Sequence, residues 1–71
     1  MTPDKLIRMA NQIATFFDSQ PGENAAAEIA DHLTKFWEPR MKDQIYAWAD
    51  AGGEGLKPTV LAAIALMRQP A

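Results

Sequence analysis

The side chains that could do chemistry in this 71-residue chain are few, and they lie apart. His32 is the single histidine, and Glu28 precedes it by four residues, so the two side chains would share one edge of a helix. Such a pair could form half of a metal site, but the chain has no second histidine and no cysteine to complete a common transition-metal ligand set. We therefore interpret Glu28 and His32 as a surface pair, and we expect the isolated chain to bind no metal, flavin or pterin.

Nucleophilic and acid–base catalysis lack a recognisable set of residues. Ser19 is the only serine, and no sequence arrangement suggests that His32 activates it. The carboxylates are spread over helix edges, and no pair of them is marked for acid–base work. The sequence thus predicts a non-catalytic binding module rather than an enzyme.

Composition narrows the class of partner. The formal net charge is −2 with a pI of about 5.1, and the seven basic residues are scattered along the chain. Nucleic-acid binding requires a concentrated positive surface, so a protein partner is favoured and a nucleic acid is not expected. A small helical regulatory protein associated with nucleic acid remains the alternative. The longest apolar run, residues 60–67, is too short to span a bilayer, and the first residues do not resemble a signal peptide, so we expect a cytoplasmic protein with no membrane partner.

Apolar residues recur at helical spacing in four segments, and proline and glycine separate these segments. The pattern predicts an all-α fold and a single helical domain over residues 1–71. We expect a small bundle of four short helices, at about residues 3–19, 24–38, 39–51 and 58–68.

Local signals mark the ends of these helices. Thr2 and Asn24 are suited to be N-caps of the first two helices, Pro21 and Gly22 should end the first, and Gly52 is a natural left-handed cap for the third. The first two helices have equal apolar faces and a short turn between them, which predicts an antiparallel pair. Their apolar patterns coincide when displaced by twenty residues. A duplicated helical unit would explain this, and so would convergence of two amphipathic helices.

The large side chains on the predicted inward stripes define an expected core. Its leading members are Ile13, Phe17, Leu33, Phe36, Trp37, Ile45 and Ile64.

The middle of the chain predicts a corner between two helices. Pro39 disfavours helical geometry at Glu38 and suits the first turn of a new helix. Phe36 and Trp37 lie just before it and should pack inward, as aromatic side chains at helical spacing usually do. The sharper interpretation is that part of the corner docks a partner, with Arg40 on the outside and able to pair with an acidic group.

The last helix is apolar almost all round, which is typical of a helix buried on every side. A domain of this size can cover only one of its faces. Leu61 and Leu66 should therefore be partly exposed, available to a partner or to a second copy in a homodimer of the isolated chain.

The chain resembles the delta subunit of bacterial NAD-dependent formate dehydrogenases, the soluble complexes that contain molybdenum or tungsten. The resemblance covers nearly the whole chain, and its most specific block is FWEPRM at residues 36–41. It is also carried by RMANQIA at 8–14 with FF at 16–17, by IA at 29–30, by HL at 32–33, and by GEGL at 53–56 with the proline at 58.

The resemblance implies an accessory subunit that has no catalytic residues of its own and is associated with formation or stability of an active complex, and with metal-cofactor insertion. The implied partners are a large catalytic subunit, with a bis-pterin molybdenum or tungsten centre and Fe–S clusters, and electron-transfer subunits that carry FMN and Fe–S clusters and reduce NAD. It leaves open which subunit this chain contacts and which metal is present. The candidate contact residues are Phe36, Trp37, Pro39, Arg40 and Met41, together with Leu61 and Leu66 of the last helix.

Overall fold

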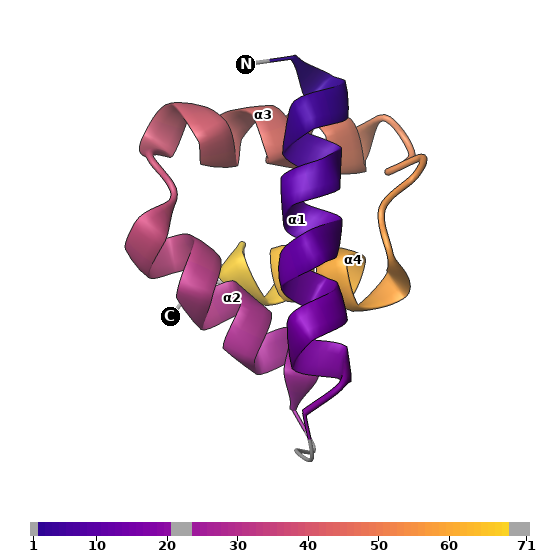
Figure 1. Ribbon diagram of the computed structural model, residues 1–71. Coiled ribbons are helices and arrows are strands. Elements are labelled where there is room, and N and C mark those ends of the chain that lie inside the picture. The colour runs from indigo at the N-terminus through magenta and orange to yellow at the C-terminus, as the bar shows by residue number, and fades with distance from the viewer. Residues whose placement is uncertain (1, 21–23, 69–71) are drawn as a thin grey trace.

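The computed structural model describes residues 2–20 and 24–68, and within these ranges it is helical with no strand. The elements are α1 (Pro3–Asp18), α2 (Ala25–Phe36), α3 (Pro39–Asp50) and α4 (Pro58–Met67), joined as Figure 1 shows. The predicted all-α fold and its four helices are confirmed, and each predicted boundary lies within two residues of the observed one.

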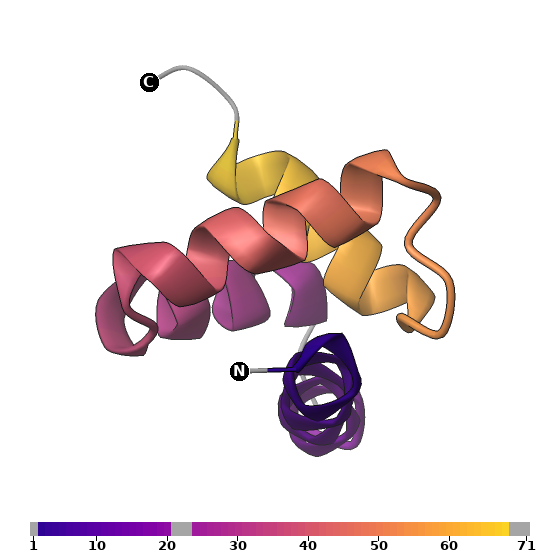
Figure 2. The same cartoon turned by 90° about the horizontal axis from the view of Figure 1, so that it is seen from above.

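The helices cross one another rather than lying side by side in parallel rows. In Figure 1, α1 lies in front of α3 and α4, and in Figure 2, which looks along α1, it stands to one side of the other three helices. The most extensive packing is between α2 and α4. The expected antiparallel pairing of the first two helices is therefore only a secondary contact, since α2 runs obliquely back from the end of α1 and rests mainly on α4.

Three of the four helices begin at a residue that favours a helix start. The Thr2 side chain accepts a hydrogen bond from the Lys5 backbone N–H at 3.4 Å, as predicted for an N-cap, and prolines occupy the first turns of α1, α3 and α4. The prediction for Asn24 is wrong, because its side chain makes no capping hydrogen bond. Its backbone, at φ −130° and ψ 58°, is outside the extended region from which a capping side chain reaches the first turn.

The helix ends are formed by backbone hydrogen bonds. α1 ends at Asp18, and the expected stop at Pro21 and Gly22 lies outside the described residues. At the end of α3 the N–H of Gly52 donates to the Ala49 carbonyl at 3.1 Å and that of Gly53 to the Trp48 carbonyl at 2.9 Å. These two bonds make a Schellman motif, and the positive φ of Gly52, 119°, confirms its predicted role.

Gly53 has a backbone conformation that favours glycine, with φ 64°. A Cβ atom there would also lie 2.6 Å from a Leu61 methyl carbon, so a side chain at residue 53 would require the end of the Leu61 side chain to shift.

A single core of apolar side chains holds the four helices together. Its buried members are Leu6, Ala10, Ala14, Ile29, Ala30, Leu33, Trp37, Ile45, Leu56, Val60, Ala63 and Ile64.

Most of the predicted core is confirmed, with one clear error. Leu33, Trp37, Ile45 and Ile64 are buried, while Ile13 and Phe17 are half-buried and pack against the core.

Phe36, however, is 71% exposed, so its assignment to the core is wrong. α2 ends at Phe36, and Trp37 is already extended at φ −88° and ψ 138°. Glu38, which Pro39 restricts, is also extended at φ −68° and ψ 154°. This change of direction buries the Trp37 indole and leaves Phe36 outside the core.

Long-range hydrogen bonds fix the loop between α3 and α4. The Asn11 side chain donates to the Gly55 carbonyl at 2.8 Å and accepts from the Lys57 backbone N–H at 3.0 Å. The Trp48 indole N–H donates to the Glu54 carbonyl at 2.8 Å. The loop is thus attached to both α1 and α3.

None of the helices in the described ranges has the length and apolar character to cross a membrane.

Candidate partner-binding surfaces

Four rings from α1 and α2 form a continuous patch that we call the aromatic surface: Phe16, Phe17, His32 and Phe36. The ring centroids of Phe16 and Phe17 are 5.3 Å apart, those of Phe17 and His32 are 6.1 Å apart, and those of His32 and Phe36 are 4.8 Å apart. Phe16 is 59% exposed and Phe36 is 71% exposed, whereas the two inner rings are half-buried. The aromatic surface therefore exposes two large apolar side chains to solvent, and these contact two half-buried rings.

Two shallow hollows lie on either side of the inner rings, and Phe17 and His32 line both of them. The hollow on the α1 side is completed by Met9, Gln12, Ile13 and Phe16. The hollow on the α2 side is completed by Ala27, Glu28, Asp31, Lys35 and Phe36. One is thus nearly all apolar, and the other has an apolar floor with a charged rim.

The charges on that rim are unequally paired. The ammonium group of Lys35 lies 3.0 Å from a carboxylate oxygen of Asp31, one helical turn away. Glu28, also on the exposed side of α2, makes no ion pair with any described residue. The aromatic surface therefore has one open carboxylate at its edge, and the local charge is negative.

The corner between α2 and α3 offers less than the sequence suggested. Trp37 is only 6% exposed and belongs to the core, and Met41 is half-buried against it. Pro39 and Arg40 are exposed beside a shallow hollow, and Arg40 forms no ion pair with a described residue. Inside the corner, the Lys42 ammonium donates to the Thr34 carbonyl at 3.1 Å. Of the candidate contact residues at the corner, Phe36, Pro39 and Arg40 are therefore the accessible ones.

The predicted partial exposure of the last helix is confirmed. Leu61 is 37% exposed and Leu66 is 41% exposed, while Val60, Ala63 and Ile64 form the buried face. These two leucines are less exposed than either outer phenylalanine of the aromatic surface.

The end of α4 is attached to α3 by Arg68. Its guanidinium lies 2.6 Å from a carboxylate oxygen of Asp50 and 5.2 Å from the centre of the Tyr46 ring. The hydrogen bond to Asp50 raises the pKa of Arg68 above its ordinary value.

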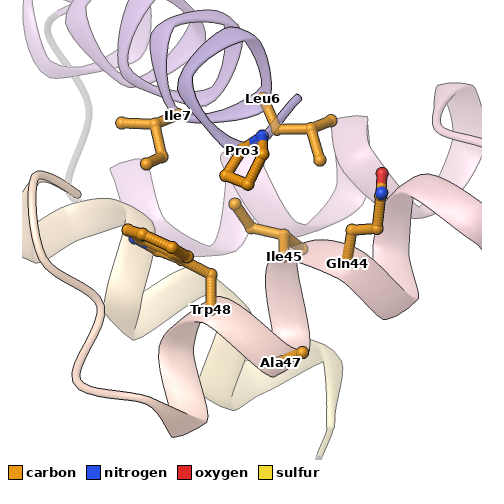
Figure 3. Close-up of a pocket in the computed structure, with 7 residues that line it drawn as sticks. All are labelled: Pro3, Leu6, Ile7, Gln44, Ile45, Ala47 and Trp48. Atoms are coloured by element: carbon orange, nitrogen blue, oxygen red, sulfur yellow. The ribbon is translucent and has the colours of Figure 1, made fainter. Parts of the chain in front are cut away.

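A small pocket of about 220 Å³ lies between the start of α1 and the middle of α3 (Figure 3). Its lining is mainly apolar, with Leu6 and Ile7 facing Ile45 and Trp48. The volume is below the usual range for small-molecule sites, and the Trp48 indole N–H is already bonded to the Glu54 carbonyl. We therefore do not regard this pocket as a cofactor site.

The Glu28 and His32 pair of the sequence analysis does not develop into a metal centre. The His32 ring lies between Phe17 and Phe36, where it forms part of the aromatic surface. Among residues 2–20 and 24–68, no group of three or more His, Cys, Asp or Glu side chains is placed to hold a metal ion.

Sequence reasoning named Phe36 as a candidate contact residue, but it also placed Phe36 in the core and did not predict that rings of the first two helices form one surface. One available signal was the pair of matching dipeptides, Phe16-Phe17 and Phe36-Trp37, displaced by twenty residues. Adjacent helical residues point about 100° apart, so both members of such a dipeptide cannot face the centre of the core. In both dipeptides the first residue, Phe16 or Phe36, is the exposed one.

Comparison with known proteins identifies a family. A family model described as the NADH-dependent formate dehydrogenase delta subunit, FdsD, matches residues 5–64, which include all of α2 and α3 and most of α1 and α4. Neither the curated proteins nor the solved structures contain a significant match to the chain.

Proposed function

Because the chain belongs to the family of NADH-dependent formate dehydrogenase delta subunits, we propose that it is a non-catalytic accessory subunit of such a complex. In this proposal it binds the large subunit that carries the metal cofactor and supports its assembly, cofactor insertion or stability. The observation that carries the proposal is the family match over residues 5–64.

The chemistry of the described residues supports an accessory role. The one histidine is packed between aromatic rings, and the one serine, Ser19, has its hydroxyl bonded to the Phe16 carbonyl at 2.8 Å. The cofactors of the proposed complex, a bis-pterin molybdenum or tungsten centre, Fe–S clusters and FMN, would then be held by the partner subunits. This chain would act through contacts alone.

The exposed apolar side chains support binding to another protein. Large exposed apolar patches on a small protein mark interaction sites, because water is displaced when a partner covers them. Here the candidates are the aromatic surface, the leucines of α4 and the exposed part of the corner at Arg40. No comparable concentration of basic residues favours nucleic acid, since Lys35 and Arg68 are already paired with carboxylates.

A subunit without ligand groups can still promote cofactor insertion. If it binds the conformation of the large subunit that accepts the cofactor more tightly than other conformations, it increases the population of that conformation. Binding also stabilises the folded large subunit by mass action. The two effects are separable, because the first changes metal content per large subunit and the second changes how much large subunit survives.

The test is to express the formate dehydrogenase complex with and without this chain and to measure three quantities on the same preparations. These are the recovery of the large subunit, its molybdenum or tungsten content, and formate-dependent NAD reduction. An insertion role predicts normal recovery with low metal content, and a stabilising role predicts low recovery with normal metal content in what remains. Unchanged recovery, metal content and activity without the chain would refute the proposal.

A further inference from the structure

We propose that the aromatic surface is the docking site for one amphipathic segment of the large subunit, which places two neighbouring apolar side chains in the two hollows and a basic side chain beside Glu28. This inference rests on the proposed function, since it specifies where and how the large subunit is bound.

The first argument is the extent of apolar exposure. Single exposed apolar residues are normal on folded proteins and need no explanation. Phe16 and Phe36, however, are 59% and 71% exposed and are connected through the rings of Phe17 and His32. Aromatic side chains of this kind dominate the binding energy of protein interfaces, particularly near the centre of the buried area.

The second argument is the shape of the surface. The two hollows share Phe17 and His32 as a common wall, so they are adjacent, and one short stretch of the partner can fill both. This wall is held in place because Phe17 packs against the core and because the rings of Phe17 and His32 are both half-buried. A surface that is ordered before binding loses little conformational entropy when the partner arrives.

The third argument is charge, and it decides between a different protein and a second copy of this chain. The ammonium of Lys35 is engaged with Asp31 at 3.0 Å, which leaves Glu28 as the open charge on the rim. In a twofold dimer through this surface, two rims that each carry two carboxylates and one ammonium, and so a net negative charge, would be brought together. Like charges at an interface oppose association, whereas a basic residue on a different partner would pair with Glu28.

The other candidate surfaces are weaker by the same criteria. The exposed fractions of Leu61 and Leu66, 37% and 41%, are smaller, and Trp37 is buried at the corner. The pocket of Figure 3 is small, and none of the described residues in its lining is charged. Among the surfaces formed by the described residues, only the aromatic surface combines large exposed rings, two adjoining hollows and an open charge.

The experiment uses the co-expressed complex, with an affinity tag on this chain and the large subunit measured in the eluate. In the first variant, Phe16→Ser is combined with Phe36→Ser, and in the second, Glu28→Lys is introduced alone. The matched control combines Leu61→Ser with Leu66→Ser, which also removes two exposed apolar side chains but on α4. Helicity of each purified chain is measured by circular dichroism, and its mass in solution by light scattering.

We expect the double phenylalanine variant to keep its helicity, because both side chains are exposed, and to recover at least about tenfold less large subunit. Glu28→Lys should reduce recovery by roughly three- to tenfold, and Glu28→Gln by less, because it removes the charge without reversing it. The α4 control should recover as much large subunit as the parent chain.

Each contrary outcome has a distinct meaning. If the parent chain recovers no large subunit, the proposed function itself fails. If the parent chain recovers the large subunit and the phenylalanine variant recovers it equally well, the function stands and this docking site is wrong. A parent dimer that becomes monomeric in the phenylalanine variant, with recovery unchanged, would assign the surface to self-association and overturn the inference. Full recovery with Glu28→Lys would overturn the assignment of a basic partner residue.

Discussion

Phe16 and Phe36 show that two adjacent aromatic residues can differ greatly in burial. Each is the first member of an aromatic dipeptide and is exposed, whereas Phe17 and Trp37, the second members, contact the core or belong to it. The equivalence of the first two helices that the sequence indicated thus extends to which ring is turned outward. It does not decide between duplication and convergence, because similar packing demands produce the same pattern.

An apolar stripe does not by itself decide burial at the end of a helix. Leu33 and Ile45 lie inside α2 and α3 and are buried, as expected. Phe36 lies at the last residue of α2, where a correct helical periodicity no longer ensures that another helix lies opposite. Burial there depends on the direction of the following chain, which periodicity does not contain.

A comparison of Leu33→Ala with Phe36→Ala tests this assignment at the residue scale. Leu33 is 0% exposed, so its truncation should lower the free energy of unfolding by about 2–5 kcal/mol, much of what a domain this small possesses. Phe36→Ala should change it by about 0.5 kcal/mol or less, because the side chain is mostly in water already. Urea denaturation followed by circular dichroism measures both. Equal losses in the two variants would show that the inward register of α2 is wrong.

At the scale of elements, the helices were predictable and the attachment of their connections was not. Prolines at the starts of α1, α3 and α4 and glycines after α3 are local signals that fix the boundaries. The loop at residues 51–57 is instead held by Asn11 and Trp48. Asn11 lies on the polar side of a helical stripe, and no local pattern indicates that its amide reaches a backbone more than forty residues away.

Removing this attachment should loosen the loop while leaving the helices formed. Asn11→Ala leaves the Gly55 carbonyl and the Lys57 N–H without their partner, and we expect a loss of about 1–3 kcal/mol in the free energy of unfolding. Amide hydrogen exchange at Lys57 should become faster in the same variant. Gln12→Ala is the matched control, since its side chain is exposed and forms no hydrogen bond with a described residue. Unchanged exchange at Lys57 in Asn11→Ala would mean that the loop is fixed by other contacts.

At the scale of the whole molecule, four short helices cannot cover all of their apolar side chains. A chain of 71 residues has a high ratio of surface to volume, and α4 is apolar almost all round. The sequence predicted this surplus correctly at Leu61 and Leu66. It did not predict that the larger surplus lies on the aromatic surface, because that depends on how α1 and α2 are placed relative to each other.

The surplus on α4 leads to a prediction about the isolated chain. Leu61→Glu combined with Leu66→Glu should leave helicity unchanged, because both side chains are already more than a third exposed and the buried face of α4 is untouched. If the isolated parent forms a dimer through α4, the variant should be monomeric at the same concentration, since four added carboxylates would face one another across a twofold axis. Light scattering over a range of concentrations measures this. The control is the double phenylalanine variant, which removes apolar area from the opposite candidate surface and should leave an α4 dimer intact. A dimer that survives the glutamates and is lost with the phenylalanines would show that α4 does not mediate self-association and that like charges at the rim of the aromatic surface are tolerated.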